Sequence, residues 1–174
     1  MKSITLLTLL TSLSISAFAA DSSITQSYIQ LSEQKKLEQD KTWLRLMYAN
    51  EKGKSEVEYS GYFLSNQGKS DLKKELHSNI QALFQSAESN QSVRCRFPAR
   101  SQWIMRQLEI QESELPAVEC PEYDQWMGQI KPYKATLIYA TDFMGNPSSM
   151  FGHTLLRLDP KDQKQLNLVS YAIN

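Results

Sequence analysis

Two histidines and two cysteines are the side chains of this sequence best suited to nucleophilic or acid–base chemistry. His153 follows a turn of small residues and begins a segment of alternating polarity. That pattern predicts an imidazole at the end of a strand, where a rigid support can hold a general base. Gly152, directly before it, allows a ligand or another backbone to approach closely. His77 lies one position off the apolar stripe of a helical pattern, so we assign it no role.

Four side chains near His153 could assist it. Ser149 could be a nucleophile activated by the imidazole, but serine in an Asn-Pro turn is typically a turn or cap residue, and no Gly-x-Ser-x-Gly elbow is present. Asp142 and Asp159 could orient the imidazole, although solvated turn carboxylates are the simpler interpretation. Arg157 shares the alternating face of His153 and either meets an anionic group or is an ordinary surface charge. No metal motif, phosphate loop or dinucleotide fingerprint appears, so we expect neither a metal nor a cofactor.

Residues 1–19 have the layout of a secretory signal peptide. Lys2 gives a positive start, an uncharged apolar run follows, and Ala17-Phe18-Ala19 is a small-x-small cleavage signal. The apolar run is short for a bilayer span, and no second run of about 18 apolar residues follows it. We therefore expect a mature chain over residues 20–174, without a transmembrane segment, in an oxidising exported space. An uncleaved N-terminal anchor is the alternative.

Cys95 and Cys120 are the only cysteines, and both lie in the exported sequence. In an oxidising compartment an even pair predicts a disulfide rather than a reactive thiol. The competing interpretation, in which one cysteine is a nucleophile paired with His153, leaves the other as a free thiol. A two-cysteine metal site would need further ligands, and no histidine lies near these cysteines.

The composition limits the class of protein. The 174 residues carry 19 basic and 19 acidic side chains, and removal of Lys2 with the leader leaves 18 against 19, a net charge of −1. This balance argues against nucleic acid as a partner, because phosphate binding needs a basic excess. A hydrophobic content of 41% with 22% charged residues is enough for a core, and it disfavours disorder, collagen and a coiled coil.

The periodicity predicts an α+β fold with a helical N-terminal part that contains the disulfide loop. Helices are expected over residues 24–37, 43–48, 71–86, 99–108 and 122–130. Strands are expected over residues 135–140, 153–158 and 166–173. Three strands at the edge of a helical block make an incomplete sheet, and the sequence finishes on an apolar strand. We therefore expect a domain truncated at its C-terminus, with a small complete domain as the alternative.

The helix expected over residues 71–86 is the clearest. Its apolar stripe contains Leu72, Leu76 and Ile80, and the same pattern places Glu75 on the solvent side. Ser70 is the expected N-cap of this helix.

The stretch from Asn146 to Leu158, with Asn-Pro-Ser-Ser-Met-Phe-Gly-His at its start, resembles the signature of the Lnb-type N-terminal periplasmic domain family, formerly a domain of unknown function. The segments 43–46, 61–65 and 95–100, with Trp103 and Cys120, are similar to that family as well. The resemblance covers most of the mature chain, and residues 20–174 are identified as one such domain.

The resemblance implies a bacterial periplasmic cell-envelope protein related to lipoprotein N-acyltransferases, with a permuted papain-like antiparallel sheet. By this resemblance His153 is the general base, and the residues that shape its site are Asn146, Ser149, Gly152 and Arg157. The implied partners are lipoproteins or phospholipid acyl chains at a membrane surface. The family's cysteine nucleophile lies beyond the histidine strand, and this sequence has no cysteine after Cys120. The chain is therefore either truncated before the nucleophile or a catalytically inactive periplasmic binding or scaffold module.

Overall fold

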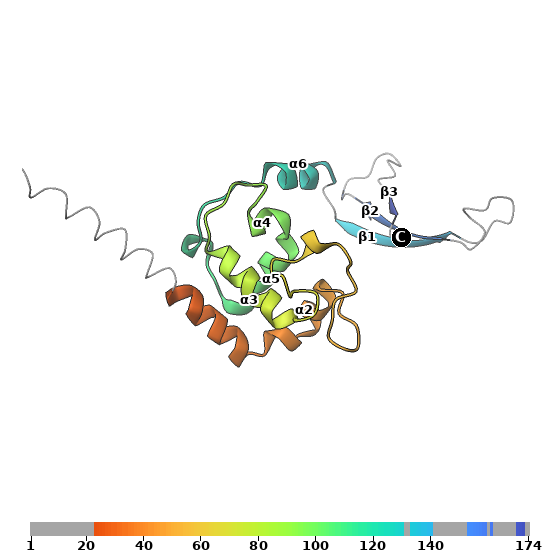
Figure 1. Cartoon of the computed structure of the whole chain (residues 1–174). Coiled ribbons are helices and arrows are strands. Elements are labelled where there is room, and N and C mark those ends of the chain that lie inside the picture. Colours follow the sequence, from red (N-terminus) through yellow and green to blue (C-terminus); the bar gives the residue numbers. More distant parts are fainter. Residues whose placement is uncertain (1–22, 131–132, 141–152, 160, 162–169, 173–174) are drawn as a thin grey trace, which may run out of the picture. The chain divides into compact units, whose positions relative to one another are not determined.

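The computed structural model describes residues 23–130, 133–140, 153–159, 161 and 170–172 (Figure 1). The chain divides into two compact units, with the boundary between Glu119 and Cys120. The first unit is helical, and the second contains one helix and an antiparallel sheet among its described residues. The expected α+β class, with a helical part ahead of the strands, is confirmed. The expected leader, residues 1–19, lies outside the described residues.

The first unit is built from short helices joined by turns. Its described elements are a helix over residues 23–34, η1 (Leu37–Gln39), α2 (Lys41–Leu46), η2 (Ser60–Tyr62), α3 (Leu72–Leu83), α4 (Val93–Arg96), α5 (Pro98–Leu108) and η3 (Glu112–Glu114). The helices expected over residues 24–37, 71–86 and 99–108 are confirmed, with the first two ending earlier than predicted. Helix α4 was not predicted, because a four-residue helix is too short to show a period.

Side-chain caps fix where two of these helices begin. Asp40 accepts a hydrogen bond from the backbone N–H of Thr42 at 2.7 Å and starts α2. Asp71 accepts from the backbone N–H of Lys74 at 3.0 Å and starts α3. The expectation that Ser70 caps α3 is wrong, since its hydroxyl donates to the carbonyl of Gln67 instead. A carboxylate at this position also interacts favourably with the helix dipole.

Two tryptophans form the centre of the apolar core of the first unit. The rings of Trp43 and Trp103 stack with centroids 5.7 Å apart, and the Trp43 indole N–H donates to the Leu72 carbonyl at 3.2 Å. This arrangement joins α2, α3 and α5, of which α3 and α5 run close together in Figure 1. The core also contains the buried residues Met47, Leu76, Ile80, Leu83, Ile104 and Leu108.

Glu75 lies in this core with no exposed surface, which corrects the expectation that it faces solvent. Its carboxylate accepts hydrogen bonds from the backbone N–H groups of Leu64 and Ser65 at 2.9–3.0 Å, and from the Asn79 amide at 2.8 Å. A Cβ at the buried Gly68 would collide with this carboxylate, so only glycine fits there. The loop before α3 is therefore closed onto the helix by one side chain.

Arg100, from α5, supplies the opposite charge. Its Nη1 lies 3.5 Å from the Glu75 carboxylate and donates to the Tyr62 carbonyl at 2.7 Å. Its guanidinium lies over the Tyr62 ring at 3.9 Å and over the Phe97 ring at 4.2 Å. Only 3% of Arg100 is exposed. The pair thus ties α3, α5 and the loop before α3 into one structure.

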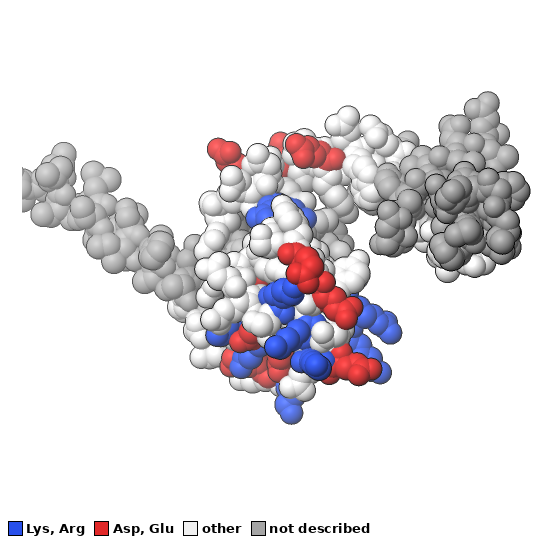
Figure 2. Space-filling view, turned by 45° about the vertical axis from the view of Figure 1, so that its right-hand side comes forward, with Lys and Arg blue, Asp and Glu red and all other residues white. Residues whose placement is uncertain are grey.

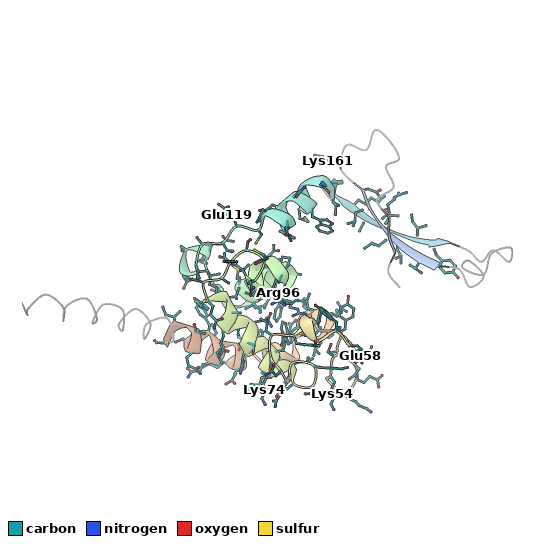
Figure 3. The ribbon with its side chains drawn as sticks, turned by 45° about the horizontal axis from the view of Figure 1, so that its top comes forward. Lys54, Glu58, Lys74, Arg96, Glu119 and Lys161 are labelled. Atoms are coloured by element: carbon teal, nitrogen blue, oxygen red, sulfur yellow. The ribbon has the colours of Figure 1, made fainter. Side chains whose placement is uncertain are left out.

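The surface of the first unit mixes both signs of charge. Figure 2 shows Lys and Arg side chains interspersed with Asp and Glu rather than gathered in one patch. Lys69 pairs with Glu58 at 2.6 Å. Figure 3 shows Lys54 and Lys74 pointing away from the core. Among the described residues, no helix is long and apolar enough to cross a membrane.

The second unit begins with α6 (Pro121–Ile130) and continues into the sheet. Strands β1 (Lys134–Ala140), β2 (His153–Asp159) and β3 (Ser170–Ala172) pair antiparallel in the order β1-β2-β3. The first two strands match the expected ranges to within one residue. The third strand is confirmed over residues 170–172, and residues 162–169 lie outside the described residues.

Cys95 and Cys120 are both disulfide-bonded, which confirms the expected bridge. Cys95 lies in α4, and Cys120 directly precedes α6. Prolines follow both cysteines, and Pro98 and Pro121 are the first residues of α5 and α6, where a missing N–H costs nothing. Because both cysteines are bonded, neither is a free thiol, and the competing interpretation of one of them as a nucleophile does not hold for this structure.

We expect Glu75→Gln to lower the free energy of unfolding by about 3–5 kcal/mol, because it leaves the buried Arg100 charge uncompensated. Urea unfolding followed by tryptophan fluorescence measures this change. Glu56→Gln is the matched control, since Glu56 is exposed, and it should change stability by less than about 0.5 kcal/mol. Equal stability of the two variants would contradict the structural role of Glu75.

Reduction of the disulfide should lower the stability of the protein by about 3.5 kcal/mol, because an open segment of this length gains chain entropy when unfolded. The double variant Cys95→Ser/Cys120→Ser should reproduce that loss without reductant. Thermal unfolding monitored by circular dichroism provides the comparison. Free thiols in the unreduced protein would show that the bridge does not form.

Candidate functional site

His153 is the first residue of β2, and its backbone pairs with Ala140, the last residue of β1. The hairpin ladder therefore holds the histidine backbone at the end of the sheet where residues 141–152 connect the two strands. This confirms the predicted position at the start of a strand. The predicted site residues Asn146, Ser149 and Gly152 lie outside the described residues and stay predictions.

The register shows which side chains of β1 and β2 share a face. Residues directly opposite one another in an antiparallel pair project on the same side, and every second residue follows. Thr136 lies opposite Arg157, and Lys134 lies opposite Asp159. One face of the hairpin thus carries a group of polar and charged side chains at the end of β2 that is remote from position 153.

One ion pair and one hydrogen bond join three of these side chains. The Arg157 Nε lies 2.8 Å from one Asp159 carboxylate oxygen, and the Thr136 hydroxyl donates to the other at 2.9 Å. Burial acts to raise the pKa of Asp159, but the contacts with Thr136 and Arg157 outweigh it and lower that pKa. Asp159 is only 6% exposed and belongs to β2. Its interpretation as a solvated turn carboxylate is therefore wrong.

Asp159 does not orient the imidazole. It stands six residues beyond His153 in the same strand. At a rise of about 3.3 Å per residue, their Cα atoms are roughly 20 Å apart. Arg157 is nearer, at roughly 13 Å along the strand. Asp142, the other carboxylate considered for this role, lies outside the described residues.

His77 lies on α3 and is half-buried rather than on the open surface. Its Nε2 is 3.5 Å from a carboxylate oxygen of Glu33, which also pairs with Lys73 at 2.8 Å. Burial lowers the pKa of His77, and the attraction of Glu33 opposes this only in part. The contacts join α3 to the helix over residues 23–34, which gives His77 a structural role.

An open groove of about 490 Å³ lies along the end of α5. Its lining is of mixed polarity and consists of Gln102, Met105, Arg106, Glu109, Ile110, Gln111 and Glu112. Neither histidine contributes to it, so we assign it no reaction. Within the described part of the chain, no group of three or more His, Cys, Asp or Glu side chains could hold a metal ion.

Two family models match separate parts of the chain. Residues 122–174 match the Lnb N-terminal periplasmic domain, and residues 35–107 match a domain of unknown function, DUF7843. The first match contains β1, β2 and β3, and the second contains Glu75 and Arg100. The resemblance noted above for residues 43–46, 61–65 and 95–100 falls in the DUF7843 segment. No curated protein and no solved structure matches the chain.

We expect the stability of the protein to fall between about pH 7 and pH 5, in part because of His77. The folded-state pKa of His77 lies below its ordinary value of 6.5, so protonation favours the unfolded chain. The loss begins as the pH falls below 6.5 and levels off below the folded-state pKa. His77→Gln should flatten this dependence in urea unfolding, and His153 is unchanged in both proteins. Identical pH profiles would refute the role of burial at His77.

Proposed function

We propose that this chain, whose residues 122–174 match the Lnb N-terminal periplasmic domain, is a periplasmic cell-envelope protein that takes part in thiol-dependent acyl transfer to lipoproteins. The observation that carries the proposal is His153, which stands at the first residue of β2 within the matched segment. The antiparallel pairing of β1 and β2 is consistent with a permuted papain-like sheet. Residues 1–19 are proposed as the export signal, and the disulfide agrees with an oxidising compartment.

The proposed role of His153 is that of a general base. The imidazole takes the proton of a thiol, and the thiolate attacks the carbonyl carbon of an acyl ester. As the ester C–O bond breaks, the imidazolium returns the proton to the departing alcohol oxygen, and a thioester remains. The amine of the lipoprotein's N-terminal cysteine then attacks the thioester. An amide forms and the thiol is released.

The thiol of this scheme is neither Cys95 nor Cys120 while the disulfide is intact. We propose that a cysteine beyond residue 174 supplies it.

The same observation favours a second candidate. With both cysteines bonded to each other, residues 1–174 offer no thiolate, which fits a catalytically inactive periplasmic binding or scaffold module. The two candidates differ in turnover, and one assay separates them.

In the protein encoded by the complete gene, His153→Ala should reduce acyl transfer by roughly 100-fold to 10,000-fold, the usual contribution of a general base. The assay follows transfer of a labelled acyl chain from a phospholipid to the N-terminal amine of a diacylated lipopeptide by mass spectrometry. His77→Gln is the matched control and should keep its activity, because His77 serves packing. Activity retained by His153→Ala would refute the general-base role. No turnover by the unmodified protein would favour the binding module.

A further inference from the structure

The group of Thr136, Arg157 and Asp159 on β1 and β2 places a guanidinium beside a buried carboxylate. One carboxylate oxygen of Asp159 accepts a hydrogen bond from the Thr136 hydroxyl at 2.9 Å, and the other lies 2.8 Å from the Arg157 Nε in an ion pair. The ion pair does not have the alignment of a hydrogen bond, since neither the Nε nor that carboxylate oxygen has a hydrogen-bond partner. The ion pair keeps the guanidinium beside Asp159, and its two terminal nitrogens make no hydrogen bond to the residues that the structure describes.

Stability alone gives a poor account of this construction. A carboxylate that is 6% exposed has lost most of its hydration, and pairing with one arginine commonly repays that cost only in part. An apolar pair at positions 157 and 159 of β2 would stabilise the hairpin at least as well. The arrangement is better explained by a need to keep a guanidinium at this place.

The described surroundings of Arg157 favour an anion. A quarter of its side chain is exposed, although its Nε is buried. Lys134, opposite Asp159 in the register, is exposed as well. Arg157 and Lys134 against Asp159 leave a charge of +1 in this group of three. A planar guanidinium whose terminal nitrogens make no hydrogen bond to the described residues matches two oxygens of a phosphate group.

We propose that Arg157, positioned by Asp159 and Thr136, binds the phosphate group of a phospholipid acyl donor. This rests on the proposed function, in which the acyl ester comes from a phospholipid and His153 acts on it. Arg157 and His153 stand in the same strand, with roughly 13 Å of strand between their Cα atoms. A substrate whose reacting ester and anionic group lie several bonds apart can occupy that span. Arg157 is thus a binding residue, and Asp159 and Thr136 are positioning residues.

Binding of a soluble short-chain phospholipid, dihexanoylphosphatidylglycerol, tests the proposal by titration calorimetry without requiring turnover. Arg157→Ala should weaken its binding roughly 10-fold to 100-fold, the usual effect of losing hydrogen bonds to a charged group. Asp159→Asn and Thr136→Val should weaken it by smaller factors. Arg157→Lys keeps the charge but loses the planar fork, so it should recover only part of the affinity. Lys54→Ala, an exposed cation of the first unit, is the control and should bind as the unmodified protein does.

Two further ligands identify the group that is recognised. Dihexanoylglycerol has the same acyl chains without phosphate, and its binding should be equal in Arg157→Ala and the unmodified protein. Equal losses for both lipids would indicate a structural role for Arg157 and overturn the proposal. Inorganic phosphate that bound as tightly as the phospholipid would overturn the lipid as the source of the anion. Equal binding of the phospholipid by Arg157→Ala and the unmodified protein would overturn it as well.

Kinetics separate this proposal from the proposed function. In the acyl-transfer assay, Asp159→Asn should raise KM for the phospholipid donor several-fold and leave kcat nearly unchanged, with no such change for a neutral acyl ester. An equal effect on both donors would overturn the positioning role. Phospholipid binding that depends on Arg157, in a protein without turnover, would refute acyl transfer and leave the anion site standing.

Discussion

The helical unit depends on one constraint, the burial of a carboxylate at Glu75. A buried charge is tolerated only when its oxygens are fully engaged, and here backbone N–H groups, an amide and a guanidinium all converge on it. These partners come from three places, namely the loop before α3, α3 itself and α5. The loop is thereby held against the helix, and Gly68 is required where the backbone passes the carboxylate. The tryptophan stack and the surrounding apolar residues pack around this fixed centre.

A second carboxylate, Asp159, meets an arginine in a different environment. Arg100 lies over two aromatic rings and is almost completely buried, so its pairing with Glu75 serves the fold. Arg157 is held through one nitrogen and keeps a quarter of its side chain exposed. The carboxylate–arginine pair of the DUF7843 segment is thus buried, whereas the pair of the Lnb segment has a partly exposed arginine. The difference in exposure separates a structural ion pair from a candidate ligand site.

Local patterns predicted most of the elements, because apolar periodicity, caps and turn residues act over short distances. The stripe of α3, the strand that begins at His153 and the disulfide could all be predicted in this way. The burial of charged residues could not be predicted from such local patterns. Glu75 occupies a position that its own helix would expose, and its burial depends on partners outside that pattern, in the loop before α3 and at Arg100. Asp159 was likewise placed in a turn, because its partner Thr136 is 23 residues away.

The disulfide also determines what happens to a chain that is cut. Cys95 lies within the DUF7843 segment, and Cys120 lies between the two matched segments, close to the start of the second. A protease that cleaves the backbone anywhere between these cysteines leaves two pieces that stay covalently joined. On a denaturing gel run without reductant, a chain nicked in this connection would therefore migrate as one species. Only a thiol would separate the segment that carries Glu75 from the one that carries His153.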